Sequence, residues 1–116
     1  MEIRIIKAPI ARSELAKLAN AGFGNIVKAV VDISQEIMAI GGELHADEEV
    51  LLTTTEGSLR ENTWGINLYP QEGVDRFVEF DSMINLKPAF GNRSRGVENQ
   101  EVQEKIKNIV NKLIVE

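Results

Sequence analysis

Residues 25–40 read NIVKAVVDISQEIMAI, and this stretch predicts a β-hairpin. Between residues 25 and 33, apolar side chains alternate with their neighbours in the period of two that is typical of a half-buried strand. Ser34, Gln35 and Glu36 follow as turn residues, and residues 37–40 return as a second apolar strand. The two strands are therefore expected to pair as antiparallel neighbours.

Signals on both sides of this hairpin predict further elements. Residues 3–6 favour a first strand, and a short helix is expected between Ser13 as its N-cap and Gly22 as its stop. After the hairpin, a helix capped near Asp47 is expected over residues 47–52, because the three threonines at residues 53–55 disfavour a long helix.

The second half of the chain predicts two strands and a helix. Residues 63–69 and 77–86 alternate as strands that pair in a hairpin, so their polar side chains should share one face. Residues 101–114 carry apolar side chains at the helical repeat with charged side chains between them. The predicted fold is a single α+β domain over residues 1–116, a two-layer sandwich of a mostly antiparallel sheet with helices packed on one face.

Composition excludes several classes of protein. The chain has 116 residues, of which 43% are hydrophobic and 27% charged, which is the balance of an ordinary globular domain. It has no cysteine, so disulfide scaffolds and thiolate zinc sites are excluded. The sequence shows neither a signal peptide nor a membrane-spanning stretch, so a cytoplasmic protein without a membrane partner is expected.

The net charge of −5 is distributed unevenly. Residues 43–86 hold ten acidic residues against two arginines, whereas residues 87–97 hold three basic residues and no acidic one. The acidic balance argues against non-specific nucleic-acid binding, which needs a broad basic face. The basic segment can hold an anion, or it can fold back onto the acidic segment as internal ion pairs.

Three stretches carry candidate functional residues. The first is GGELHADEE at residues 41–49, where Gly41 and Gly42 allow close backbone approach to a ligand and His45 is the single histidine of the chain. His45 with Asp47 and Glu49 could hold a divalent metal, but this spacing is not diagnostic of a metal site. The acidic residues are equally what a helix N-terminus favours, so we assign neither a metal nor any other cofactor.

The second stretch is the polar face of the late hairpin. It is formed by Asn67, Tyr69, Glu79, Asp81 and Asn85. Such a face is often only the solvated side of an antiparallel sheet. Asp81 and Asn85, however, are residue types that strands disfavour, and they are expected in the middle of one. This cost favours a functional interpretation.

The third stretch is GNRSRG at residues 91–96. Its two arginines, Arg93 and Arg95, fall on one side of an extended loop, and Asn92 and Ser94 add hydrogen-bonding groups beside them. Guanidinium groups next to a hydroxyl suit phosphate or carboxylate. The alternative is that both arginines pair with the acidic residues 47–49.

Several of these runs together resemble a known family. They are KAVVD at residues 28–32, residues 40–49, WGINLYP at 64–70, EFDSMIN at 79–85 and residues 91–97. Over most of the chain they resemble a family of short prokaryotic proteins that is classed as a domain of unknown function. The resemblance implies a small stand-alone protein and assigns no reaction, cofactor or catalytic residue.

The leading functional hypothesis is a polar cleft that binds a small anionic molecule bearing a phosphate or carboxylate. Its ligand-binding residues would be Gly41, Gly42, Asn67, Asn85, Asn92, Arg93, Ser94 and Arg95, and its acid–base candidates are His45 and Asp81. One alternative is a protein–protein interaction module or homodimer, in which the acidic and basic segments pair across the interface and the last helix shares its apolar stripe with a second copy. Another is a metal-assisted hydrolase at His45. Whether the protein is an enzyme is left open.

Overall fold

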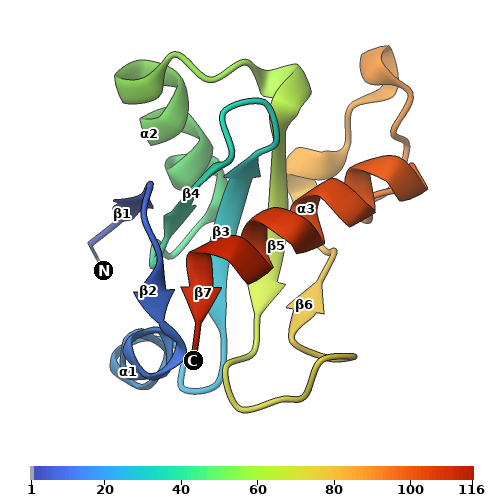
Figure 1. The fold of residues 1–116 in the computed structure, drawn as a ribbon. Coiled ribbons are helices and arrows are strands. Elements are labelled where there is room, and N and C mark those ends of the chain that lie inside the picture. The colour runs from blue at the N-terminus through green and yellow to red at the C-terminus, as the bar shows by residue number, and fades with distance from the viewer. Residues whose placement is uncertain (1) are drawn as a thin grey trace.

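The computed structural model describes residues 2–116, which form a five-stranded sheet with three α-helices (Figure 1). The sheet has the order β1-β4-β3-β5-β6, and every neighbouring pair in it is antiparallel. The α+β class and the mostly antiparallel sheet are therefore confirmed. The strands are β1 (Arg4–Ile6), β3 (Val27–Asp32), β4 (Ile37–Ile40), β5 (Thr63–Leu68) and β6 (Val78–Glu79).

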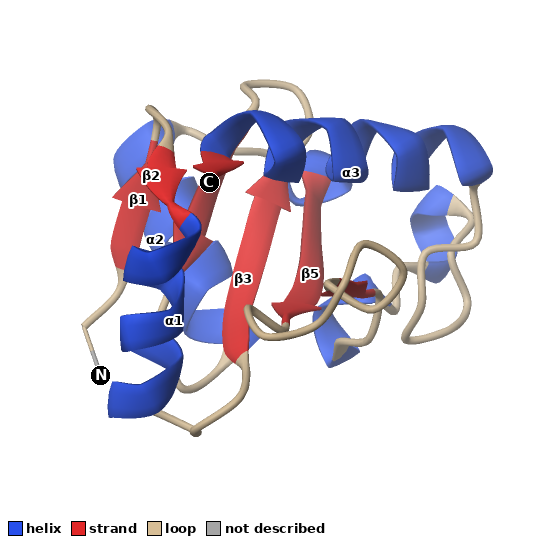
Figure 2. Cartoon of the chain, turned by 60° about the horizontal axis from the view of Figure 1, so that its bottom comes forward, coloured by secondary structure: helices blue, strands red, loops and turns tan. Residues whose placement is uncertain are grey.

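The helices lie on both faces of the sheet rather than on one. The first face is covered by α1 (Arg12–Ala21) and α3 (Gln100–Leu113), whereas α2 (His45–Glu56) packs on the opposite face (Figure 2). Because β3 is sandwiched between these layers, its residues from 29 to 32 are all buried. The strand is thus buried on both faces except at Lys28, and not half-buried along its length as its alternation suggested.

The last helix forms as the apolar repeat predicts. Asn99 is its N-cap, and the Asn99 side chain accepts hydrogen bonds from the backbone N–H groups of Glu101 and Val102. Its stripe of Ile106, Ile109, Val110 and Leu113 is buried in the core. Ile114 belongs instead to β7 (Ile114–Val115), which pairs in parallel with β2 (Ile10–Ala11).

The first two helices begin earlier than predicted. Helix α1 starts at Arg12, directly after β2, and Ser13 does not cap it. Helix α2 starts at His45 instead of near Asp47, and it continues through all three threonines. The hydroxyl groups of these threonines donate to backbone carbonyls of the same helix, which keeps the run compatible with a helix that Gly57 ends at a φ of 67°.

The predicted strand over residues 77–86 is largely wrong. Only β6 pairs with β5, and the chain then turns into the short 3₁₀ helix η2 (Met83–Asn85). Ser82 caps η2 through its hydroxyl group, and its backbone N–H donates to the carbonyl of Arg95. These bonds replace the ladder that a longer strand would have made. Two further 3₁₀ helices are η1 (Arg60–Asn62) and η3 (Pro88–Phe90).

The buried side chains form two clusters, one on each face of the sheet. The larger lies beneath α1 and α3, and the smaller joins Leu52 of α2 to Val30 and Ala39 of the sheet. Helix α2 covers only part of its face, because its first residue, His45, lies against Ile66 of β5 and its last residue, Glu56, lies against Gln35 in the turn after β3. Among residues 2–116, no helix has the length and apolar character needed to cross a membrane.

Candidate ligand-binding cleft

A cleft of about 530 Å³ opens where α2 leaves its face of the sheet uncovered. Its floor is a row of polar side chains from three strands, Lys28 of β3, Asn67 of β5 and Glu79 of β6. Lys28 is paired with Asn67 across the β3–β5 ladder, and Asn67 with Glu79 across the next ladder. Residues directly opposite each other point to the same face, so the register alone aligns these three groups.

The start of α2 forms one wall of the cleft, and the segment after β6 forms the other. Leu44, His45 and Ala46 line the first wall, and residues 81–84 line the second. The second wall is seated on Gly65, where a Cβ atom would lie 2.5 Å from the Cβ of Ser82. Asn85 also holds the second wall against Gly65. Its Oδ1 accepts from the Gly65 N–H at 2.8 Å, and its Nδ2 donates to the Gly65 carbonyl at 2.9 Å.

His45 is held in one tautomer by the backbone. Its Nε2 lies 2.8 Å from the carbonyl oxygen of Ile66, and because a carbonyl can only accept, Nε2 carries the proton. Burial lowers the pKa of His45 below its ordinary value, the hydrogen bond to Ile66 opposes this, and the nearby charge of Lys28 lowers the pKa further. The charge of Asp81 and the side chain of Asn67 also raise the pKa, but burial outweighs them, so His45 is neutral at pH 7 and its Nδ1 carries no proton.

Glu79 connects two other side chains of the cleft by hydrogen bonds. Its Oε1 accepts hydrogen bonds from the Asn67 amide and the Tyr69 hydroxyl, each at 2.9 Å. Burial, followed by the hydrogen bond to Glu79, raises the pKa of Tyr69. The Asn67 amide nitrogen also donates to the Asp81 carbonyl at 3.2 Å, but the Asn67 Oδ1 has no partner among the described residues, although the side chain is only 6% exposed. Such buried groups are nearly always satisfied, so this oxygen marks unused hydrogen-bonding capacity.

The positive charges of the cleft are not equivalent. The Arg95 Nε donates to Asp81 Oδ1 at 2.8 Å, so these two charges compensate each other. Within residues 2–116, Lys28 forms no ion pair, and its ammonium lies 5.4 Å from the centroid of the Phe23 ring. Within residues 2–116 no side chain caps α2, and because Leu44, His45 and Ala46 line the cleft, the partial positive charge of the helix N-terminus faces it.

Four of the predicted site residues meet in this cleft. They are His45, Asn67, Asp81 and Arg95. The other predicted residues lie elsewhere: Gly41 and Gly42 line a neighbouring cavity, Arg93 and Ser94 are exposed outside the cleft lining, and Asn85 and Asn92 are buried with their side chains bonded to backbone.

Lys28 was missed by the sequence analysis. It lies in the predicted first hairpin, where an exposed lysine on a strand is an unremarkable residue. The available signal was that it falls on the face opposite Val27, Ala29 and Val31. Only the pairing of β3 with β5 places Lys28 beside Asn67, and the sequence of neither strand predicts the register of that pairing.

Comparison with known proteins gives a family. Residues 4–113 match the family model described as "Protein of unknown function (DUF5674)". The chain belongs to this family. The expected membership of a family of unknown function is thereby confirmed. No curated protein and no solved structure matches the chain significantly, so family membership contributes no reaction and the cleft carries the functional argument.

The grouping that the metal hypothesis needs does not form. No three histidine, aspartate or glutamate side chains among residues 2–116 lie close enough together to share a metal ion. Glu49 accepts from the Thr63 hydroxyl at 2.6 Å and lies 3.4 Å from the Arg60 guanidinium. Arg95 pairs with Asp81, so the predicted pairing of Arg95 with residues 47–49 does not form.

Proposed function

We propose that this protein binds a small molecule carrying a phosphate or carboxylate group in the Lys28–His45 cleft. The observation that carries the proposal is positive charge without a counter-ion at a concave site. The Lys28 ammonium has no carboxylate partner within residues 2–116, and the uncapped end of α2 lies on the wall beside it. A volume of about 530 Å³ falls within the range of small-molecule sites.

The anionic group is proposed to lie between Lys28 and the first turn of α2. Backbone N–H groups at a helix start point along the axis and favour negative charge, and a lysine ammonium adds a full positive charge. His45 and Ala46 are the first two residues of this helix, and both line the cleft. In this proposal Lys28 binds the anionic group, whereas the sequence predicted that Arg93 and Arg95 would bind it.

The rest of the ligand would meet the polar floor. Asn67 supplies an acceptor oxygen without a partner, which a small rotation of the amide would present to a ligand N–H or O–H group. Neutral His45 supplies a second acceptor at Nδ1. His45 and Asp81 stay candidates for acid–base chemistry on the bound molecule, with His45 as the proton acceptor.

The homodimer hypothesis receives no comparable support. It relied partly on the apolar stripe of the last helix being shared with a second copy, and Ile106, Ile109, Val110 and Leu113 are buried within the chain itself. It relied also on the acidic and basic segments pairing between molecules, and Arg95 pairs with Asp81 within the chain.

A thermal-shift experiment with Lys28→Met tests the proposal. Methionine keeps much of the apolar stem of lysine and removes the charge. Inorganic phosphate, glycerol 3-phosphate and succinate are the probes, and Lys17→Met is the matched control because Lys17 is exposed on α1 outside the cleft. A probe at about 100 times its Kd should stabilise the wild type by about 2.7 kcal/mol, which raises Tm by several degrees.

The shift is expected to disappear in Lys28→Met and to remain in Lys17→Met. An equal shift in both variants would place the anion elsewhere and overturn the proposal. No shift of the folded wild type with any of the probes would overturn it as well.

A further inference from the structure

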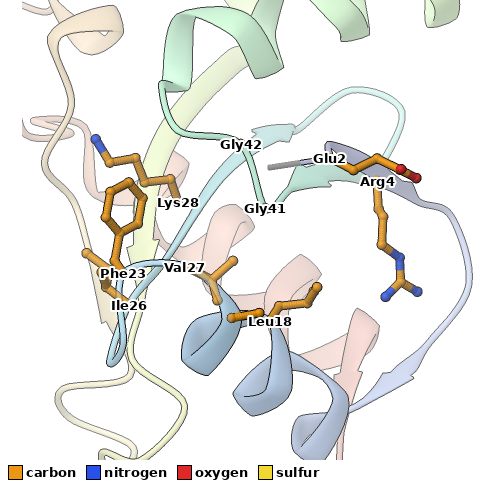
Figure 3. A pocket seen from close by; sticks show the side chains of 11 residues that line it. Glu2, Arg4, Leu18, Phe23, Ile26, Val27, Lys28, Gly41 and Gly42 are labelled. Atoms are coloured by element: carbon orange, nitrogen blue, oxygen red, sulfur yellow. The ribbon is translucent and has the colours of Figure 1, made fainter.

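A second cavity of about 280 Å³ lies beside the cleft, at the same end of the sheet. It is framed by the last turn of α1, the start of β3 and the glycines that follow β4. Figure 3 shows Leu18 and Val27 at its base, with Phe23 and Lys28 side by side at one end and Arg4 at the other. Its side chains are mostly apolar, which distinguishes it from the polar cleft.

The two cavities share a boundary. Ile26 and Lys28 line both of them. The Lys28 ammonium lies over the Phe23 ring on the side of the apolar cavity, and its charge lowers the pKa of His45 on the side of the polar cleft. A molecule whose anionic group reaches Lys28 can therefore extend from there directly into the apolar cavity.

Nothing else in this cavity competes for an anion. Arg4, at its far end, is paired with Glu14 at 2.6 Å. Gly41 and Gly42 contribute a wall without side chains, and the backbone carbonyl of Glu2 lies 3.1 Å from where a Cβ atom on Gly41 would stand. Apart from Glu2, Arg4 and Lys28, the side chains that line the cavity are apolar, so its middle suits a hydrocarbon group.

Exposed apolar side chains gather around both cavities. Phe23 is 48% exposed beside the apolar cavity, and Leu44 and Met83 are 55% and 63% exposed at the polar cleft. Apolar groups left in water around a concave site mark a surface that a ligand can cover.

From these observations we infer that the ligand is amphiphilic. Its anionic group binds at Lys28, and its apolar chain occupies the cavity lined by Leu18, Phe23 and Val27. This inference rests on the proposed function and names the class of its ligand. The combined volume of the two cavities stays within the range of about 300–1,000 Å³ that small-molecule sites have.

Calorimetric titration with n-alkyl monophosphates tests this inference. Inorganic phosphate represents the anionic group alone, and butyl, hexyl, octyl and decyl phosphate extend the chain, each below its micelle concentration. Each buried methylene should tighten binding about fourfold. The gain should level off at about nine chain carbons, because at about 30 Å³ per group a cavity of about 280 Å³ is then filled and further methylenes stay in water.

Ala21→Phe is the variant that fills the apolar cavity. Ala21 is an exposed residue of α1 that lines this cavity, whereas its neighbour Asn20 is exposed and does not line it. In Ala21→Phe, octyl phosphate should bind no more tightly than butyl phosphate, and inorganic phosphate should keep its affinity. Asn20→Phe adds the same ring to the same turn and should behave as the wild type.

Several outcomes would overturn the inference. An affinity that does not depend on chain length would do so, and so would a chain-length gain that survives Ala21→Phe. In both cases phosphate binding that depends on Lys28 would leave the proposed function standing. If neither inorganic phosphate nor any alkyl phosphate binds, the inference fails. The proposed function fails with it if succinate also gives no thermal shift that depends on Lys28. Binding to phosphatidic acid vesicles without binding of free decyl phosphate would assign the anion to a lipid surface and overturn the inference of a free amphiphile.

Discussion

Asp32 and Asn67 lie at opposite ends of the same face of the sheet, and both are buried. Asp32, only 1% exposed, accepts hydrogen bonds from the backbone N–H groups of Ser34 and Gln35, from the Gln35 side chain and from the Ser58 hydroxyl. Asn67 uses its amide nitrogen twice and leaves its oxygen without a partner among residues 2–116. The hydrogen-bonding capacity of Asp32 is thus in use, whereas that of Asn67 is used only in part.

Two lysines repeat this contrast. Lys87, near the Asp32 end, is buried and donates to the backbone carbonyls of Arg60 and Thr63. Burial lowers its pKa to about 8. Neither lysine forms an ion pair within residues 2–116, but the Lys28 ammonium, at the other end, also has no hydrogen-bond acceptor among them. The fold uses Asp32 and Lys87 for its own stability, whereas Asn67 and Lys28 keep hydrogen-bonding capacity or charge for a ligand.

The largest expected effect on stability is that of removing the Asp32 carboxylate. Asp32→Ala should lower the free energy of unfolding by about 3 kcal/mol, because it strips several buried donors of their acceptor. Urea denaturation measures this loss. Asp75→Ala, at an exposed loop position, is the control and should stay within about 0.5 kcal/mol of the wild type. A loss of similar size in both variants would remove the contrast between the two ends.

Gly65→Ala should cost about 2 kcal/mol and also weaken phosphate binding, since the new Cβ atom must displace Ser82 from the wall of the cleft. The measurements are urea denaturation and calorimetric titration with phosphate. Gly73→Ala is the matched control, because a Cβ atom there meets nothing within 4 Å. Adding Ser82→Gly should recover part of the lost stability. An unchanged Gly65→Ala protein would show that the wall is not seated on this glycine.

The last prediction concerns Glu48, a fully buried carboxyl group beside Gly42, and its effect is small near pH 4 and grows as the pH rises. Its Oε2 accepts from the N–H of Gly42 at 2.9 Å, and its Oε1 has no partner within residues 2–116. Burial raises the pKa of Glu48 from 4.5 to about 9. Between these values the folded state holds a proton that the unfolded chain has lost, so stability falls as pH rises through this window.

Glu48→Gln should remove this pH dependence. The wild type should lose about 1 kcal/mol per pH unit relative to the variant between pH 5 and pH 8, and the two should converge near pH 4. Urea midpoints at a series of pH values measure the difference, in which the titrations of His45 and Lys87 cancel because both proteins share them. Parallel pH profiles would mean that Glu48 is ionised in the folded state.

Predictability differed between the parts of the molecule. The hairpin of β3 and β4 and the stripe of α3 were predictable, because local apolar periodicity specifies an element and its buried face. The strand over residues 77–86 was not, because Ser82 and Asn85 take their hydrogen bonds from Gly65 and Arg95, which are distant in sequence. The start of α2 at His45 shifted for a related reason, since His45 bonds to the carbonyl of Ile66.

The sequence by itself determined the α+β class, the central hairpin, the last helix and the family. It also indicated His45, Asn67, Asp81 and Arg95 as polar residues that a plain fold does not require. Only the tertiary structure decided that these four residues share a cleft with Lys28. It also decided that the side chains of Asn85 and Asn92 form hydrogen bonds with backbone groups and do not line the cleft. The reason is physical: local periodicity sets which face a side chain takes, whereas strand register and distant hydrogen bonds set its neighbours.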